Sequence, residues 1–188
     1  MNTYALLIRG INVGGKNKVP MAGLIKCLEE LGLADVSTYI ASGNVVLKSS
    51  RRPDEIKARV EEALPKNFKL DSALIRVLAL SRSQLQAVID NRPKGFGDQP
   101  AKYHSDAIFL MGIDVAQAML VFDPREGVDK IWPGVGVIYS QRLNSLRTKS
   151  RLSKIVGTPA YKSMTIRNWS TTTKLLELLI SADARRQA

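Results

Sequence analysis

The chain has very little cysteine and histidine, with one residue of each among 188. Cys27 alone cannot form a disulfide within the chain, and such sparse cysteine is typical of a reducing compartment. Nucleophilic schemes that pair serine or cysteine with a histidine base have only His104 as a candidate. Zinc sites of cysteine and histidine need more ligands than these two residues supply. We therefore expect no metal site, and we expect no cofactor.

Long apolar runs are also lacking. The run at residues 5–8 is too short for a signal peptide, and Arg9 follows it directly. No segment approaches the roughly 20 apolar residues that span a bilayer. We expect a cytoplasmic protein that does not enter a membrane, present as a monomer or a dimer.

Acidic residues are too few to balance the basic ones. The sequence has 28 Lys and Arg against 17 Asp and Glu, a formal net charge of +11. Such a surface attracts polyanions, although net charge says nothing of fold or activity. Five basic residues could follow a phosphate backbone, namely Arg142, Arg147, Lys149, Arg151 and Lys154. No known nucleic-acid-binding motif accompanies them, so nucleic acid is a weaker hypothesis than a solvated basic face.

The hydrophobic pattern predicts alternating strands and helices. One predicted helix, for example, has apolar residues at i, i+3, i+4 and i+7, namely Leu24, Cys27, Leu28 and Leu31. Strands are predicted at residues 4–8, 36–40, 45–47, 73–80, 107–111, 128–132, 135–139 and 164–167. Helices are predicted at residues 20–31, 53–64, from 81 onward, 114–122, 150–156 and 170–182.

Each half thus has the order β-α-β-β-α-β-α. The first six elements are those of the split βαβ, or ferredoxin-like, unit. We therefore predict an α+β fold of two ferredoxin-like units at residues 1–92 and 101–188, each with an extra C-terminal helix. A linker rich in Pro, Gly and charge would join them at residues 93–100. This internal duplication rests on pattern alone, and a single mixed sheet with helices on one side is the alternative.

A glycine-rich segment, residues 9–18, follows the first predicted strand, and we call it the first loop. Its glycines allow a tight turn and bring backbone N–H groups close to a ligand. Arg9, Lys16 and Lys18 add positive charge beside those groups, which is how a chain builds an anion site. The predicted ligand-binding residues are Arg9, Asn12, Gly14, Gly15 and Lys16. A purely conformational loop is the alternative.

The first loop also comes close to a phosphate-binding P-loop. Gly10, Gly15 and Lys16 satisfy the spacing G-x-x-x-x-G-K. Asn17, however, stands where a Ser or Thr would hold Mg²⁺, and Pro20 would break the helix that a P-loop requires. A P-loop nucleotide hydrolase is therefore disfavoured.

The turn Ser42-Gly43-Asn44 is a second candidate segment. In a split βαβ unit, the end of the first strand and the turn between the second and third strands lie at the same edge. We therefore expect this turn beside the first loop, with Ser42 and Asn44 lining the same pocket as Asn12. A hairpin turn with no further role is the alternative, because Gly and Asn tolerate positive φ.

A third segment, Arg167-Asn168-Trp169, lies where the last strand is predicted to meet the last helix. A helix N-terminus offers free N–H groups and partial positive charge, and Arg167 could bind phosphate or carboxylate in a bidentate way. This predicts a second anion site at Arg167 and Asn168. The alternative is that Asn168 and Ser170 cap the helix while Trp169 anchors it in the core.

These three segments in this order resemble the "domain of unknown function 1697" family. The resemblance extends over almost the whole chain, because the segments lie near its start, in its first quarter and near its end. The family usually has Asn where this chain has Ser170, which puts a role of that side chain in doubt. The resemblance implies an α+β fold of ferredoxin-like parts, and it implies no activity.

The sequence therefore predicts a module that binds an anionic small molecule, such as a nucleotide or a phosphorylated metabolite. One alternative is a nucleic-acid-associated protein that uses the basic surface. Another is an enzyme acting on a phosphorylated substrate, for which catalysis would depend on positioning and electrostatics alone.

Overall fold

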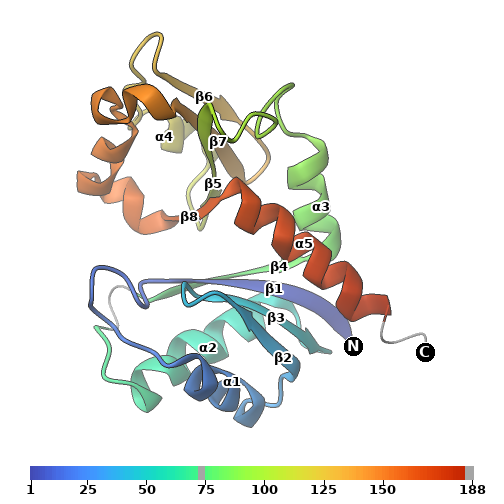
Figure 1. Ribbon diagram of the computed structural model, residues 1–188. Helices are drawn as coiled ribbons and strands as arrows, with labels where there is room; N and C mark the ends of the chain where they lie inside the picture. The colour runs from blue at the N-terminus through green and yellow to red at the C-terminus, as the bar shows by residue number, and fades with distance from the viewer. Residues whose placement is uncertain (72–74, 185–188) are drawn as a thin grey trace. The chain divides into compact units, whose positions relative to one another are not determined.

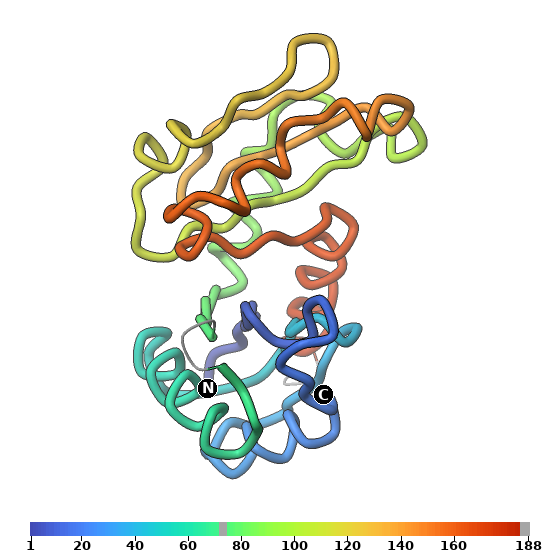
Figure 2. Tube along the Cα trace, turned by 90° about the vertical axis from the view of Figure 1, so that its left-hand side faces the viewer, coloured from blue at the N-terminus to red at the C-terminus, as the bar shows by residue number. Residues whose placement is uncertain are grey.

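The computed structural model describes residues 1–71 and 75–184. Contacts divide the chain into two compact units. The first unit consists of Met1–Leu85 and the segment from Leu175 onward, and the second unit is Gln86–Lys174. The chain passes between them within helices α3 (Arg82–Asp90) and α5 (Trp169–Ala184), whose course Figure 2 traces.

The first unit contains a four-stranded antiparallel sheet with the order β2-β3-β1-β4. Its elements along the chain are β1 (Asn2–Arg9), α1 (Met21–Glu30), β2 (Ala34–Tyr39), β3 (Asn44–Ser49), α2 (Pro53–Asn67) and β4 (Arg76–Ser81). The strand predicted at 73–80 is confirmed from residue 76, and its predicted start at residues 73 and 74 lies outside the described residues.

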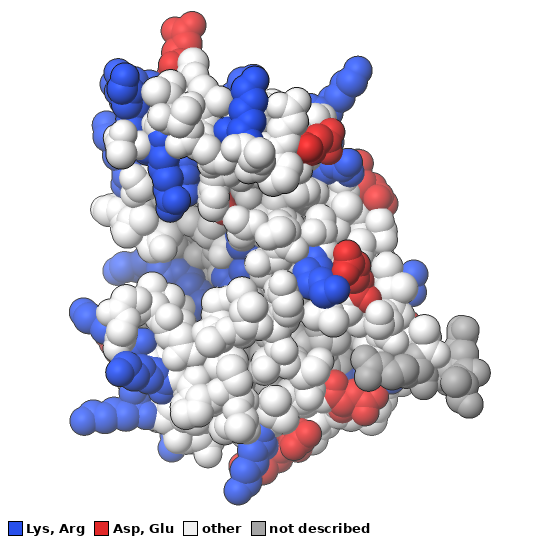
Figure 3. All heavy atoms as spheres, viewed as in Figure 1, with Lys and Arg blue, Asp and Glu red and all other residues white. Residues whose placement is uncertain are grey.

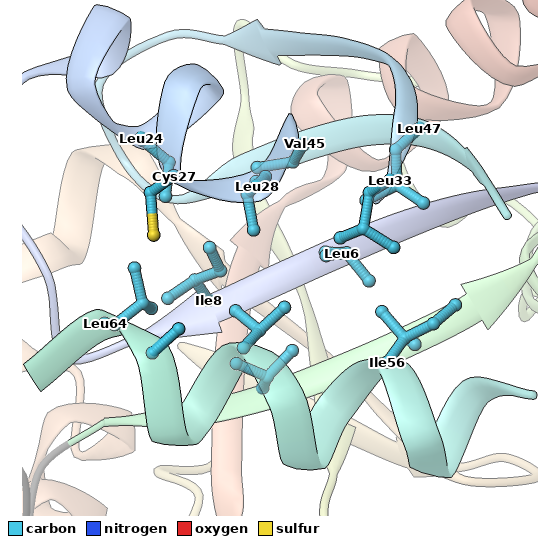
Figure 4. Packing of buried hydrophobic residues seen from close by; sticks show 14 of the residues in the cluster. Leu6, Ile8, Leu24, Cys27, Leu28, Leu33, Val45, Leu47, Ile56 and Leu64 are labelled. Carbon is cyan, nitrogen blue, oxygen red and sulfur yellow. The ribbon is translucent and has the colours of Figure 1, made fainter. Parts of the chain in front are cut away.

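Helices α1 and α2 cover one face of this sheet (Figure 1). Alternate residues of β1 face the helices, because successive side chains of a strand point to opposite faces. Leu6 and Ile8 thus pack with Leu28 of α1 and Leu64 of α2 in one buried cluster (Figure 4). Arg9, one position beyond Ile8, therefore belongs to the opposite face of the sheet.

The second unit contains a second four-stranded antiparallel sheet, with the order β6-β7-β5-β8. Its elements are β5 (Tyr103–Leu110), α4 (Val115–Met119), β6 (Asp129–Pro133), β7 (Val137–Leu143), the 3₁₀ helices η2 (Asn144–Lys149), η3 (Leu152–Gly157) and η4 (Pro159–Ser163), and β8 (Met164–Asn168). Ile108, Ile138 and Ile155 belong to the apolar cluster on one face.

Residues 93–100, expected as a linker, lie within the second unit. Phe96 is 1% exposed there, and its ring makes edge-on contacts with three aromatic rings. The centroid distances are 5.0 Å to Trp169, 5.3 Å to Tyr139 and 5.9 Å to Trp132. This aromatic cluster ties the segment to β6, β7 and the start of α5.

Two predicted helices of the second unit differ from those observed. Asp114 caps α4 by accepting a hydrogen bond from Gln117 N, as predicted, but α4 ends at Met119 rather than at residue 122. The helix predicted at 150–156 is observed as the 3₁₀ helix η3, with η2 before it and η4 after it. Turn-forming and helix-breaking residues, including Pro159, recur through this segment and prevent a longer helix.

The structure confirms the α+β class and shows two separate antiparallel sheets rather than one mixed sheet. Numbered within each unit, the strands have the same order in both sheets. No helix in the described part of the chain is long and apolar enough to cross a membrane.

Candidate functional site

The tip of the first loop is a two-residue turn. Lys16 N donates a hydrogen bond to Val13 O at 3.0 Å across Gly14 and Gly15. Both glycines have positive φ, +57° and +76°, which is the backbone of a type I′ turn. A Cβ added to either glycine would meet nothing within 4 Å. Their place in the sequence therefore follows from backbone conformation, and both lie exposed at the tip.

Asn12 fastens the first loop to the neighbouring turn. Its Nδ2 donates to Val19 O and to Ala41 O, both at 3.0 Å, and its Oδ1 accepts from Val19 N at 2.8 Å. The expectation that the first loop and the turn after β2 are neighbours is thereby confirmed. Both amide protons of Asn12 are engaged within the protein, so only Oδ1 has capacity left for a ligand.

Asn17 performs a similar task at the base of the loop, and sequence reasoning missed it. Its Nδ2 donates to Gly10 O at 2.8 Å, and its Oδ1 accepts from Asp71 N at 2.9 Å. Its φ of +49° is one that Asn adopts more readily than most residues. The sequence signal that could have identified Asn17 is its place at the position where a P-loop has Ser or Thr.

The turn at residues 41–44 is tightly held against the end of β1. Ile8 N donates to Gly43 O at 2.8 Å, and a Cβ on Gly43 would lie 2.4 Å from Ile8 O. Asn44 is fully buried, and its Nδ2 donates to Tyr39 O at 3.2 Å and to Ser42 Oγ at 2.9 Å. Ser42 and Asn44 thus contact each other within the turn.

Two arginines lie opposite each other where the first loop leaves the sheet. Arg9 at the end of β1 pairs in register with Arg76 at the start of β4. Directly opposed residues of an antiparallel pair project from the same face, and like charges in that position repel. Both are half-buried, and both belong to the face opposite α1 and α2.

Lys16 and Lys18 extend the positive charge along the first loop. Both are exposed. Among residues 1–71 and 75–184, neither ammonium group has an ion-pair partner. Two of the predicted residues, Arg9 and Lys16, therefore provide charge at one edge of the first unit. Lys18 of the same loop and Arg76, which the sequence did not single out, add to them.

The third predicted segment lies in the second unit. Arg167 is buried, its Nη1 donates to Thr165 Oγ1 at 2.9 Å and to Ile166 O at 2.8 Å, and burial lowers the pKa of its guanidinium to about 10. Asn168 Oδ1 accepts from Ser170 N at 2.9 Å and from Ser170 Oγ at 2.7 Å. Asn168 therefore caps α5, and the buried Trp169 anchors the helix in the aromatic cluster.

The same end of the second unit has a pocket of about 430 Å³. It is lined by Gly97, Pro100, Tyr103, His104, Ser105, Asn144, Asn168, Trp169, Ser170 and Thr173. His104 Nε2 lies 3.0 Å from Asp106 Oδ1. Sequence reasoning assigned His104 no role, although the i, i+2 spacing on one strand already places His104 and Asp106 on the same face.

Cys27 is buried in the core of the first unit. Burial, and secondarily the charge of Glu30, raises the pKa of its thiol, which disfavours the nucleophilic thiolate. The described residues contain no group of three or more His, Cys, Asp and Glu side chains that could hold a metal ion.

Comparison with known proteins shows which family and which kind of solved structure the chain resembles. The sequence model of the family "Protein of unknown function (DUF1697)" matches residues 1–139, which include the first two predicted segments and His104. No curated protein matches the chain. The solved structure of the conserved bacterial protein SP0830 from Streptococcus pneumoniae is 33% identical, with a TM-score of 0.75, over 95% of this chain and 98% of that one. The chain thus belongs to the DUF1697 family of proteins of unknown function.

Proposed function

We propose that the first unit binds an anionic small molecule, of the nucleotide or phosphorylated-metabolite class, at the edge where β1 ends. The opposed pair Arg9 and Arg76 carries this proposal. Two guanidinium groups on one face repel each other, and an anion between them would turn that repulsion into two attractive contacts.

The first loop supplies the rest of the proposed site. Lys16 and Lys18 add charge, and the exposed backbone at Gly14 and Gly15 can approach a ligand closely. Asn12, Ser42 and Asn44 serve mainly to hold the loop and the turn together, since their side chains bond within the protein. Relative to the sequence prediction, the proposed site keeps Arg9, Lys16 and the two glycines, adds Arg76, and depends less on the amide side chains.

A thermal-shift titration with ADP and inorganic phosphate tests this site. A ligand at 100 times its Kd stabilises a protein by about 2.7 kcal/mol, which raises the melting temperature visibly. We expect the shift to be lost in Arg76→Gln and in Arg9→Gln. It should persist in the matched control Arg59→Gln, which changes an exposed arginine on α2.

Two results would count against the site. Equal shifts in Arg76→Gln and Arg59→Gln would show that binding does not involve the opposed pair. Shifts of similar size with every polyanion, falling together as salt rises, would show only the attraction of a +11 protein for negative charge.

Binding of nucleic acid is the second candidate, and the charge of the second unit favours it. No Asp or Glu occurs between Asp129 and Glu177. Lys and Arg side chains gather over the 3₁₀ helices η2–η4 (Figure 3). Part of this charge is already neutralised, because Asp123 lies 3.0 Å from Arg151 and 3.5 Å from Lys154.

The salt dependence of oligonucleotide binding tests this candidate. A protein that contacts several phosphates shows a log–log slope of affinity against salt of several units. We expect Arg147→Gln with Lys149→Gln to reduce that slope. Absence of binding at low salt would rule the candidate out.

We also infer that each unit is a ferredoxin-like fold and that the chain is an internal duplication. The shared strand order of the two sheets supports this. The short α4 and the 3₁₀ helices mark the second unit as the more altered copy. The single cysteine supports a cytoplasmic location.

A further inference from the structure

The pocket of the second unit, at residues 97–105, 144 and 168–173, has the features of a ligand site independent of the anion site proposed above. Its volume of about 430 Å³ is within the range that small-molecule sites occupy. Its walls combine aromatic rings, amides and hydroxyls, and none of its lining residues is a carboxylate.

The walls of this pocket are held rigidly. Asn144 Nδ2 donates to Pro100 O at 3.1 Å and to Ala101 O at 3.0 Å, which joins the start of η2 to the segment before β5. Gly97 lies so close to Trp169 that a Cβ would approach the indole to 2.2 Å. A site with fixed walls loses little conformational entropy when a ligand binds.

His104 is the one lining residue with an imidazole, which in its neutral form offers one N–H donor and one acceptor nitrogen. The bond from Nε2 to Asp106 Oδ1 orients the ring and, in neutral imidazole, favours the tautomer with its proton on Nε2. No partner of Nδ1 occurs in the described chain, so this nitrogen remains available as an acceptor.

The surroundings of the His104–Asp106 pair are positively charged. Arg142 Nη2 lies 3.9 Å from Asp106 Oδ2, and the charge of Arg147 also acts on this carboxyl. Burial raises the pKa of Asp106, while His104, Arg142 and Arg147 oppose that rise. A positive field beside a histidine acceptor suits a ligand that has both an anionic group and hydroxyl groups.

We propose that this pocket binds a small hydroxylated anion of the sugar-phosphate class, with His104 Nδ1 accepting a hydrogen bond from a ligand hydroxyl. Asp106 is a positioning residue that fixes the imidazole. The hydroxyls of Ser170 and Thr173 line the pocket with their protons bonded to Asn168 Oδ1 and Ser170 O. The attraction on the anionic group would therefore come from the field of Arg142 and Arg147 beside Asp106.

The single histidine makes a direct test possible, because the Hε1 proton of His104 gives one assignable NMR signal. Titration with ribose 5-phosphate should move this signal saturably at millimolar concentrations. An intermolecular NOE should connect Hε1 with ribose protons. In the free protein at pH 8, the nitrogen chemical shifts of the His104 imidazole should indicate the tautomer with its proton on Nε2. Asp106→Asn should change the ratio of the two tautomers.

Two matched variants locate the ligand. Thr173→Leu places a larger side chain in the pocket and should weaken binding at least tenfold, while Ser153→Leu, on the exposed surface of η3, should leave it unchanged. Arg76→Gln should also leave it unchanged, which separates this site from the one in the first unit. The proposal is overturned if ribose 5-phosphate gives no saturable shift and no NOE, or if Thr173→Leu folds and binds as the wild type does. If Thr173→Leu does not fold, the NOE and the His104 tautomer of the wild-type protein test the proposal instead.

Discussion

The two units share a strand order but cover their sheets in different ways. In the first unit, helices of 10 and 15 residues close one face over a continuous apolar cluster. In the second, a five-residue helix and three 3₁₀ helices take their place. Among the described side chains, Asp129 Oδ1 and Arg142 Nε are buried without a hydrogen-bond partner, and both belong to the second unit. The unit with short helices thus has buried polar atoms without a partner, whereas the long helices of the first unit cover an apolar core.

The glycines extend the comparison, because each unit has glycines that are closely packed and others that are open. Gly43 in the first unit and Gly97 in the second approach other atoms closely, whereas Gly14 and Gly95 have nothing within 4 Å of an added Cβ. All four have positive φ. Backbone conformation therefore does not distinguish the packed glycines from the open ones, whereas the distance to neighbouring atoms does.

The largest effect is expected for Gly43→Ala. Its Cβ would lie 2.4 Å from the backbone oxygen of Ile8, which no side-chain rotation can relieve. We expect a loss of more than about 3 kcal/mol in the free energy of unfolding, measured by urea denaturation. Gly14→Ala, at an open position, should cost only the positive-φ penalty of about 1 kcal/mol. Equal losses would show that the turn can move away from β1.

Gly97→Ala should have the next largest effect. The added Cβ would meet the Trp169 indole at 2.2 Å, but a side chain can shift where a backbone cannot. We expect a loss of about 2–3 kcal/mol in the free energy of unfolding, with a changed near-UV circular dichroism signal from the aromatic cluster. Gly95→Ala is the matched control. A near-UV signal identical to wild type would mean that Trp169 is not constrained by Gly97.

The order of elements could be predicted because it depends on local signals. The apolar spacing of α1, the Asp114 cap and the pair Ser81–Gln84 are all readable in the chain, and the last forms reciprocal hydrogen bonds at 3.2 and 2.8 Å. The extent of α4 and the 3₁₀ character after β7 depended on tertiary packing, which outweighs weak local preference.

The site was harder to predict, because a motif does not reveal what its side chains bind. Asn12 and Asn44 looked like ligands, and their amide protons bond within the protein. Arg76 became a candidate because strand pairing places it opposite Arg9, and His104 because segments distant in the sequence form a pocket around it. Such residues cannot be recognised from sequence spacing alone.

A smaller effect is expected for Asn12→Asp, which tests how firmly the first loop is fastened. The carboxylate of the variant still accepts from Val19 N. Its second oxygen, however, would face Val19 O and Ala41 O, which in the wild type accept hydrogen bonds from Nδ2. We expect a loss of about 2 kcal/mol in the free energy of unfolding. Asn2→Asp, an exposed change in the same unit, should be nearly neutral. If Asn12→Asp leaves stability intact but abolishes ligand binding, Asn12 is a ligand after all.

The smallest effect concerns Asp183 on α5, which bonds Thr3 Oγ1 and lies 3.1 Å from Arg82 Nη1. Partial burial raises the pKa of this carboxyl, but hydrogen bonds from Thr3 and Arg82 outweigh it and leave the pKa below its ordinary value of about 3.9. A carboxyl with a lowered pKa in the folded state stabilises it above the unfolded value, and this contribution is lost as the pH falls through the folded value. The stability difference between wild type and Asp183→Asn should therefore be present at pH 6 and shrink below pH ~4. Urea denaturation at both pH values measures it, and a difference that grows on acidification would mean that Asp183 does not hold α5 to the first unit through its charge.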